Sequence, residues 1–196
     1  QPVFRFAVEA VPRCAREVLS KAGLGPEDVT YTLGTPKPIV CGLSGIVRRA
    51  LDRAWDRNTV AVALFSRHAQ AAVLPVHPAS PLYDQEADQR RGYSTQALGE
   101  LLAQAGYAQD QEGRWARGGA PLELTFVVST DNTFRLSAAE YLAGELGRAG
   151  ITVDLQKLSW SDYVQALEAG DIDLYLGEVR LTADFDHVQA LERGEL

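Results

Sequence analysis

Apolar residues recur every three or four positions in four stretches of this chain. The stretches cover residues 11–22, 47–54, 97–105 and 139–149. This spacing places the apolar side chains along one side of an α-helix. The sequence therefore predicts four amphipathic helices, each with one face turned toward a core.

Capping residues mark the ends of these helices. Ser44 and Ser94 precede the second and third stretches, where a serine hydroxyl can accept a hydrogen bond from a free amide of the first turn. Glycine directly after a helix end readily adopts the left-handed conformation that closes it. Ala-Gly pairs follow amphipathic stretches at Ala22-Gly23, Ala105-Gly106, Ala149-Gly150 and Ala169-Gly170.

Alternating apolar and polar residues, the pattern of a β-strand, appear in the second half of the chain. They occupy residues 122–128, 151–155 and 172–176. Helical stretches separate them, so the order is strand, helix, strand, short helix, strand. That order predicts an α/β fold with a parallel sheet and right-handed crossovers.

The stretch from His77 to Gly92 has no such period. It is polar and contains proline, which indicates a surface connection between helices. Its length favours an ordered excursion over a simple turn.

Composition limits the class of protein. Of the 196 residues, 46% are hydrophobic and 23% are charged, as is usual for a globular domain. The net charge of −7 argues against a nucleic-acid partner. The one basic cluster is interleaved with aspartates, so we predict a solvated, salt-bridged helix face. It comprises Arg48, Arg49, Arg53 and Arg57, with Asp52 and Asp56 between them.

The sequence contains no apolar run of the roughly 20 residues that span a bilayer, and no signal-peptide pattern. The first residue is Gln and methionine is absent. We therefore expect a processed or excised piece of a longer protein, or a sequence from which modified methionines are missing.

Cys14 and Cys41 could pair in an exported protein or stay reduced in a cytosolic one.

Three segments follow the predicted strands and carry the candidate binding groups. They cover residues 129–133, 159–163 and 177–186, and the carboxyl ends of parallel strands are where ligands bind. Helix N-termini there favour an anionic group, whereas Asp184 or Asp186 would favour a cation, so the edge suits a zwitterionic ligand. Helix capping is the simpler explanation for Asp131, Asn132, Ser159 and Ser161.

Catalytic signatures are absent from the sequence. "GLSGI", residues 42–46, lacks the last glycine of a nucleophile elbow. There is no phosphate-binding glycine loop, no His-Glu-x-x-His and no Cys-x-x-Cys. His68, His77 and His187 are far apart, which favours ordinary histidines over a metal site. We predict neither an enzyme nor a cofactor.

One ordered series of motifs resembles a known family. "GIVRRALDRAWDRNTVAVAL", residues 45–64, is similar to a helix of the family 5 extracellular solute-binding proteins. These are peptide-, oligopeptide- and nickel-binding receptors of ABC importers. "ALGELLAQAGY" and the run from "AEYLAGELGRAG" to "DIDLYLGE" resemble later segments in the same order. The resemblance covers roughly residues 31–191.

The resemblance implies a fold and a site. Residues 31–196 would form the smaller, ligand-closing lobe of a periplasmic-binding-protein-like fold, with a mixed or mainly parallel sheet and helices on both faces. "ADFD", residues 183–186, resembles a motif whose aspartate meets the α-amino group of a bound peptide. Asp184 is therefore the expected ammonium partner, although Leu181 stands where the family often has an aromatic residue. The other expected ligand-binding residues are Arg180, Thr182, Phe185, Asp186, Asn132 and Trp160.

The family also implies a biological role. The chain would be one lobe of the substrate-binding component of an ABC transporter, which captures peptides or a similar small solute for import. Its partners would be the remaining lobe and permease subunits in the membrane. The protein would be exported to the extracellular face or the periplasm and lipid-anchored.

Two other readings remain open. We expect residues 1–30 to be a separate N-terminal helical segment, in which "VFRFAVEAVPRCAREVLSKAGLGPEDVTY" resembles a segment of β-ketoacyl-ACP synthase III. The downstream His and Asn motifs of that enzyme are missing. The chain could thus be a fragment related to that enzyme, or a stand-alone interaction domain with no role in transport.

Overall fold

The computed structural model describes residues 43–65, 69–74 and 76–177. The chain divides into two compact units, residues 1–30 and 31–196, and every described residue belongs to the second. The helix predicted at residues 11–22, both cysteines and the segment after Gly177 lie outside the described residues. The elements are α2 (Gly45–Asp52), α3 (Arg57–Phe65), α4 (Gln85–Arg90), α5 (Thr95–Gln104), β1 (Ala108–Gln109), β2 (Trp115–Arg117), β3 (Ala120–Pro121), β4 (Glu123–Ser129), α6 (Thr133–Arg148), β5 (Thr152–Leu158), α7 (Trp160–Ala169) and β6 (Leu174–Leu176).

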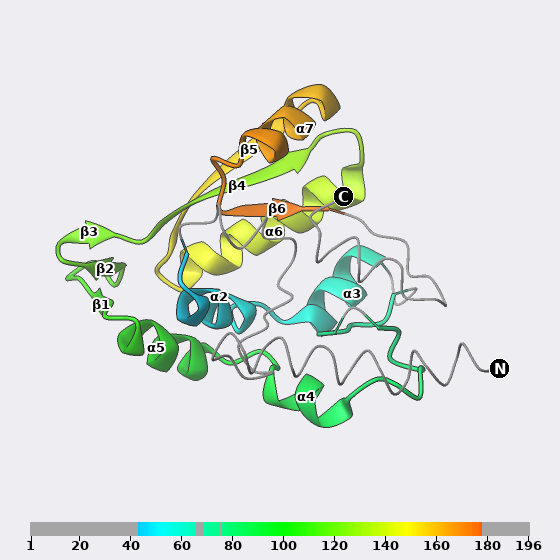
Figure 1. Ribbon diagram of the computed structural model, residues 1–196, viewed down its shortest axis with the longest axis horizontal. Coiled ribbons are helices and arrows are strands. Elements are labelled where there is room, and N and C mark those ends of the chain that lie inside the picture. The colour runs from blue at the N-terminus through cyan, green and yellow to red at the C-terminus, as the bar shows by residue number, and fades with distance from the viewer. Residues whose placement is uncertain (1–42, 66–68, 75, 178–196) are drawn as a thin grey trace, which may run out of the picture. The chain divides into compact units, whose positions relative to one another are not determined.

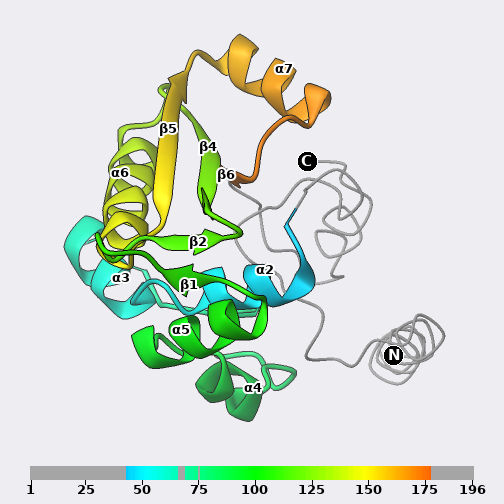
Figure 2. The same ribbon diagram turned by 90° about the vertical axis from the view of Figure 1, so that its left-hand side faces the viewer.

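A parallel sheet forms the centre of this unit. Its strand order is β5-β4-β6, and Phe126 of β4 lies opposite Leu155 of β5 and Leu174 of β6. Across the sheet, the connection from β4 to β5 goes to one side, and the connection from β5 to β6 goes back to the other side. Right-handed crossovers therefore place α6 and α7 on opposite faces of the sheet, as Figures 1 and 2 show. The predicted α/β fold with helices on both faces is confirmed.

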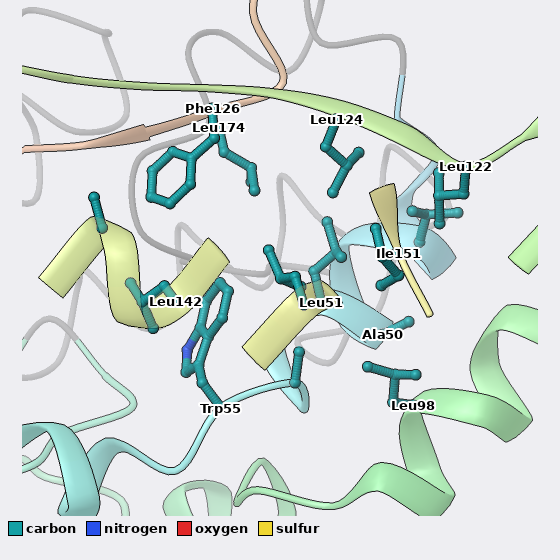
Figure 3. Packing of buried hydrophobic residues seen from close by; sticks show 14 of the residues in the cluster. Ala50, Leu51, Trp55, Leu98, Leu122, Leu124, Phe126, Leu142, Ile151 and Leu174 are labelled. Atoms are coloured by element: carbon teal, nitrogen blue, oxygen red, sulfur yellow. The ribbon is translucent and has the colours of Figure 1, made fainter. Parts of the chain in front are cut away.

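The central strand β4 contributes side chains to two cores. Leu124, Phe126 and Val128 alternate toward the larger core, where helices α2, α5 and α6 pack (Figure 3). Val127 points to the other face and joins a smaller core under α7. Burial on both faces explains why the strand is apolar at successive positions from Phe126 to Val128.

The predicted helix ends that lie within the described residues are confirmed. Ser44 Oγ accepts a hydrogen bond from Val47 N at 3.4 Å, and Ser94 Oγ accepts one from Ala97 N at 3.1 Å. The glycines of the three Ala-Gly pairs within the described residues have positive φ. They are Gly106 (84°), Gly150 (84°) and Gly170 (76°).

The structure contains elements that the sequence analysis did not predict. The connection at residues 77–92 is ordered, as predicted, but it contains the short helix α4, whose N-cap is Asp84. Residues 108–121 form an additional antiparallel sheet in the order β1-β2-β3. Its strands have only two or three residues each, which is too short to show alternation.

The predicted salt bridges of this basic cluster are present, but the prediction that it is solvated is wrong at Asp52, the last residue of α2. Asp52 is only 2% exposed. Its Oδ1 lies 2.5 Å from Arg57 Nη2 and its Oδ2 lies 3.0 Å from Arg91 Nε. The connection that precedes α5 covers this side of the helix, since Arg53 Nη1 donates to Gly92 O at 3.1 Å. Two arginines compensate the buried carboxylate, as burial of a charge requires.

Candidate functional site

The carboxyl ends of the three parallel strands lie at one edge of the sheet. Thr130, directly after β4, donates from its amide and its hydroxyl to Leu158 O at 2.9 and 3.1 Å. Tyr163 of α7 donates from its hydroxyl to Leu176 O, at the end of β6, at 3.1 Å. The segments after β4 and β5 are therefore brought together as predicted, and the third begins beside them.

The segment after β4 caps helix α6. Asn132 Oδ1 accepts hydrogen bonds from Phe134 N at 3.0 Å and Arg135 N at 3.1 Å. Asp131 forms an ion pair with Arg135 at 3.2 Å and is 44% exposed. Asn132 thus caps helix α6, as expected. Because these two bonds use Oδ1, the expected contact with a ligand would use the NH2 group of the same side chain.

The segment after β5 caps helix α7 in the same way. Ser159 Oγ accepts from Asp162 N at 3.2 Å and donates to Asp162 Oδ2 at 2.7 Å. Trp160 is the first residue of the helix, and its side chain is 55% exposed. Its ring centroid lies 5.7 Å from that of Tyr163, with 31° between the planes. One face of the indole is supported, and much of the rest is open to solvent.

Phe134 is an exposed aromatic residue that the sequence analysis did not single out. It lies in the first turn of α6 and is 58% exposed. The sequence could have indicated this exposure, because position 134 lies off the apolar stripe of the helix. With Trp160 at the start of α7, each crossover helix presents one exposed aromatic side chain at the carboxyl edge.

The Tyr163 hydroxyl is the most perturbed group at this edge. Its side chain is 2% exposed. Burial is the main cause that raises the pKa of this phenol from 10.0 to about 12. Tyr175 and Asp131 act in the same direction, and Arg135 acts in the opposite one. The neutral hydroxyl is therefore the form that the fold requires.

This pKa predicts how stability depends on alkaline pH. The folded pKa of Tyr163 lies above the unfolded value of 10.0, so the unfolded state loses the proton first and stability falls as pH rises. Between about pH 10 and pH 12 we expect Tyr163 to account for a loss of about 2 kcal/mol. Urea unfolding at several pH values should show a shallower decline in Tyr163→Phe. Equal slopes in wild type and variant would contradict the prediction, because the other tyrosines are common to both.

The remaining predicted site residues lie outside the described residues. They are Arg180, Thr182, Asp184, Phe185 and Asp186. Within the described ranges, no group of three or more His, Cys, Asp or Glu side chains is arranged to hold a metal ion. No helix in that part of the chain has the length and apolar character to cross a bilayer.

Comparison with known proteins identifies first the fold and then the family. The arrangement is that of the periplasmic-binding-protein fold, with a TM-score of 0.65 to NikA from Brucella suis in complex with Fe(III)-EDTA. That likeness has 19% identity and covers 74% of this chain and 29% of NikA. Residues 46–191 match the model of bacterial extracellular solute-binding proteins, family 5 Middle. The chain belongs to this family.

Two curated relatives show similar identity. The oligopeptide-binding protein AppA of Bacillus subtilis is 26% identical over 129 residues, which is 65% of this chain and 24% of AppA. Protein XP55 of Streptomyces lividans is 26% identical over 133 residues, 68% of this chain and 24% of that protein. The structure of AppA with a nonapeptide matches with a TM-score of 0.54 and 26% identity, over 61% of this chain and 24% of AppA. The chain thus spans about a quarter of the length of these relatives.

Proposed function

We propose that this chain is one lobe of the substrate-binding component of an ABC importer, and that it captures peptides or a similar small solute with a free ammonium group. The observation that carries the proposal is the convergence of β4, β5 and β6 on one edge, with an aromatic side chain exposed at the start of each crossover helix. The family supplies the class of protein. The lobe itself performs no chemistry.

The groups at this edge suit the positively charged end of a peptide. Asp131 is 44% exposed beside Arg135, and Asp162 is exposed on α7. Trp160 adds an aromatic face that can take an apolar side chain or a cation. Asn132 and Ser159 already occupy amides of the two helix N-termini. The described edge therefore has less to offer an anion than the sequence suggested.

The ammonium partner in this proposal is Asp184, and the other proposed contacts from the same segment are Arg180, Thr182, Phe185 and Asp186. These residues follow β6 along the chain, and β6 ends at the same edge as β4 and β5. The proposal places the ligand between this lobe and a second one, with closure trapping it. The closed form would dock on a permease at the extracellular face or in the periplasm, where the protein would be lipid-anchored.

Calorimetric titration of the full-length protein with a pool of di- to pentapeptides tests this function. We expect Asp184→Ala to weaken binding about 30-fold or more, because loss of one partner of a desolvated charge pair costs about 2–5 kcal/mol. Trp160→Ala should weaken it less. Asp171→Ala is the matched control, since it removes an exposed carboxylate between α7 and β6, away from the carboxyl edge.

A pool with acetylated amino termini isolates the ammonium group. It should bind wild type weakly and show no further loss in Asp184→Ala. Unchanged affinity of Asp184→Ala for the free peptides would remove that residue from the site. Failure of wild type to bind any peptide would direct the search to solutes of another class.

A further inference from the structure

Strand β5 forms one edge of the parallel sheet. Its seven residues, Thr152–Leu158, pair only with β4 among the described residues, and Figure 2 shows it at the side of the sheet, next to β4. Thr152 N donates to β4 at 3.1 Å and Leu158 O accepts from the residue after β4 at 2.9 Å, so the peptide groups of the even-numbered residues face β4. By alternation, the peptide groups that face away from the sheet are those of Val153, Leu155 and Lys157.

The strand lacks the features that usually block an exposed edge. Such features are proline, a β-bulge or a very short strand. β5 contains no proline, and its register with β4 runs without interruption through all seven residues. Its one lysine, Lys157, lies 2.5 Å from Glu140 of α6. The outward-facing peptide groups can therefore pair with a further strand.

The sequence of β5 is complementary to a second copy of itself. Two antiparallel copies must set outward-facing residues opposite each other, and the register centred on Leu155 does so, with Val153 opposite Lys157. This register also sets Asp154 of each copy directly opposite Gln156 of the other. Gln156 Nε2 donates to Asp154 Oδ2 of its own chain at 2.8 Å, and the amide has a second N–H for the other copy. No like charges stand directly opposite each other.

Helix α6 leaves room for a second copy beside this edge. Glu140 contacts β5 through Lys157, and Ala143 and Gly147 follow it on the same side of the helix. A Cβ added at Gly147 would meet no atom within 4 Å. Glycine weakens a helix, and nothing around Gly147 in its own unit requires it. A close approach by another helix would require a small residue there.

The two-fold axis of this pairing passes near the same part of α6. It crosses β5 at Leu155, about 7 Å from Lys157 toward the start of the strand. Because α6 runs antiparallel to the strands, that distance corresponds to about four or five residues after Glu140, between Ala143 and Gly147. Since α6 packs over both β4 and β5, its two copies would lie about 10 Å apart, the spacing of helices in contact.

We propose that the outer edge of β5 is a self-association surface, through which two copies of the protein pair β5 against β5 and α6 against α6. The two sheets would join into one continuous sheet. Because the two β5 strands run antiparallel, the carboxyl edges of the two copies face in opposite directions, so the pairing leaves both candidate binding edges open. The inference goes beyond the proposed function and does not depend on it.

Hydrogen exchange of the full-length protein, resolved to single amides, tests the pairing. In concentrated samples the amides of Val153, Leu155 and Lys157 should exchange about tenfold more slowly than in dilute samples. The amides of Asp154 and Gln156 already face β4, so their exchange should change little. This alternation is specific to pairing through the edge of β5. Sedimentation equilibrium over the same concentrations should show a monomer that converts to a dimer.

Two substitutions of Gln156 should change the dimer dissociation constant in opposite directions. Gln156→Glu sets a carboxylate opposite Asp154 in both pairs, so Kd should rise about tenfold or more. Gln156→Lys sets an ammonium group there, so Kd should fall. Gln89→Glu is the matched control, since it makes the same change of charge at an exposed position of α4 and should leave Kd at the wild-type value.

Gly147→Gln tests the helix contact separately from the strand. The new side chain has free space within one copy and favours the helix, so the thermal unfolding midpoint should not fall. Between two copies of α6 it would occupy the point of contact, and Kd should rise about tenfold or more. A full-length protein that stays monomeric at every concentration would overturn the inference, whether or not another part of that protein protects the outward amides. Dimers with the same Kd in wild type, Gln156→Glu and Gly147→Gln would overturn it too, because they would form through a different surface.

Discussion

Replacement of Asp52 by alanine is expected to lower the free energy of unfolding by about 3–5 kcal/mol, the range measured when one partner of a buried ion pair is removed. The carboxylate is 2% exposed and both of its oxygens meet an arginine, at 2.5 Å for Arg57 and 3.0 Å for Arg91. The variant would leave two largely buried guanidinium groups without their common acceptor. Urea unfolding followed by circular dichroism measures the difference.

An exposed ion pair of the same region provides the control. Arg90 and Glu86 of α4 lie 3.5 Å apart with side chains 67% and 87% exposed. Such a pair contributes about 0–1 kcal/mol, so Arg90→Gln should change stability little. A loss below about 1 kcal/mol in Asp52→Ala would show that the buried network relaxes or admits water. The arginines would then need no fixed partner.

The position of Asp52 also shows what local pattern could not reveal. The sequence spacing correctly predicts helix α2 and its cap at Ser44, because both depend on residues within one or two turns. Burial of Asp52 depends on Arg91, which is 39 positions away, and on the connection that brings it back over α2. No periodicity along the helix carries that information.

The same distinction applies to the site. The edge where the three parallel strands end could be predicted because a parallel sheet follows from the alternation of strands and helices. The caps at Asn132 and Ser159 could be predicted because a cap is a local feature. The sequence indicated Tyr163 only as the last residue of the segment 159–163. Its bond to Leu176 O could not be predicted, because that bond depends on how α7 packs against β6. The exposure of Phe134 likewise depends on how α6 packs.

The small sheet of β1, β2 and β3 was missed because its position depends on a distant contact. Trp115 of β2 donates from its indole to Ala149 O at 2.9 Å and from its amide to Gly150 O at 2.8 Å. These bonds attach the hairpin formed by β1 and β2 to the end of α6. The first bond occupies Ala149 O, a carbonyl group of the helix end that has no partner within the helix.

The contact between the hairpin and α6 makes Gly150 the second position where a small change should have a large effect. We expect Gly150→Ala to cost about 2–5 kcal/mol, as the sum of two terms. The residue has φ of 84°, and a left-handed conformation costs a non-glycine residue about 1–2 kcal/mol. The added Cβ would also lie 2.3 Å from Gly113 O, and overpacking of this kind costs about 1–3 kcal/mol more.

Gly106→Ala separates the two terms. Gly106 also has φ of 84° and also follows a helix end, but its added Cβ would meet only Arg117 Cδ at 3.5 Å, an ordinary contact with a flexible side chain. This variant should lose only the conformational term, about 1–2 kcal/mol. Urea unfolding of both variants gives the difference, and hydrogen exchange at residues 108–117 should be faster in Gly150→Ala alone, because the displaced backbone is that of the hairpin. Equal losses and equal exchange would mean that the turn at Gly113 moves aside at little cost. The attachment of the hairpin would then depend on the two Trp115 bonds and not on the close approach of the two backbones.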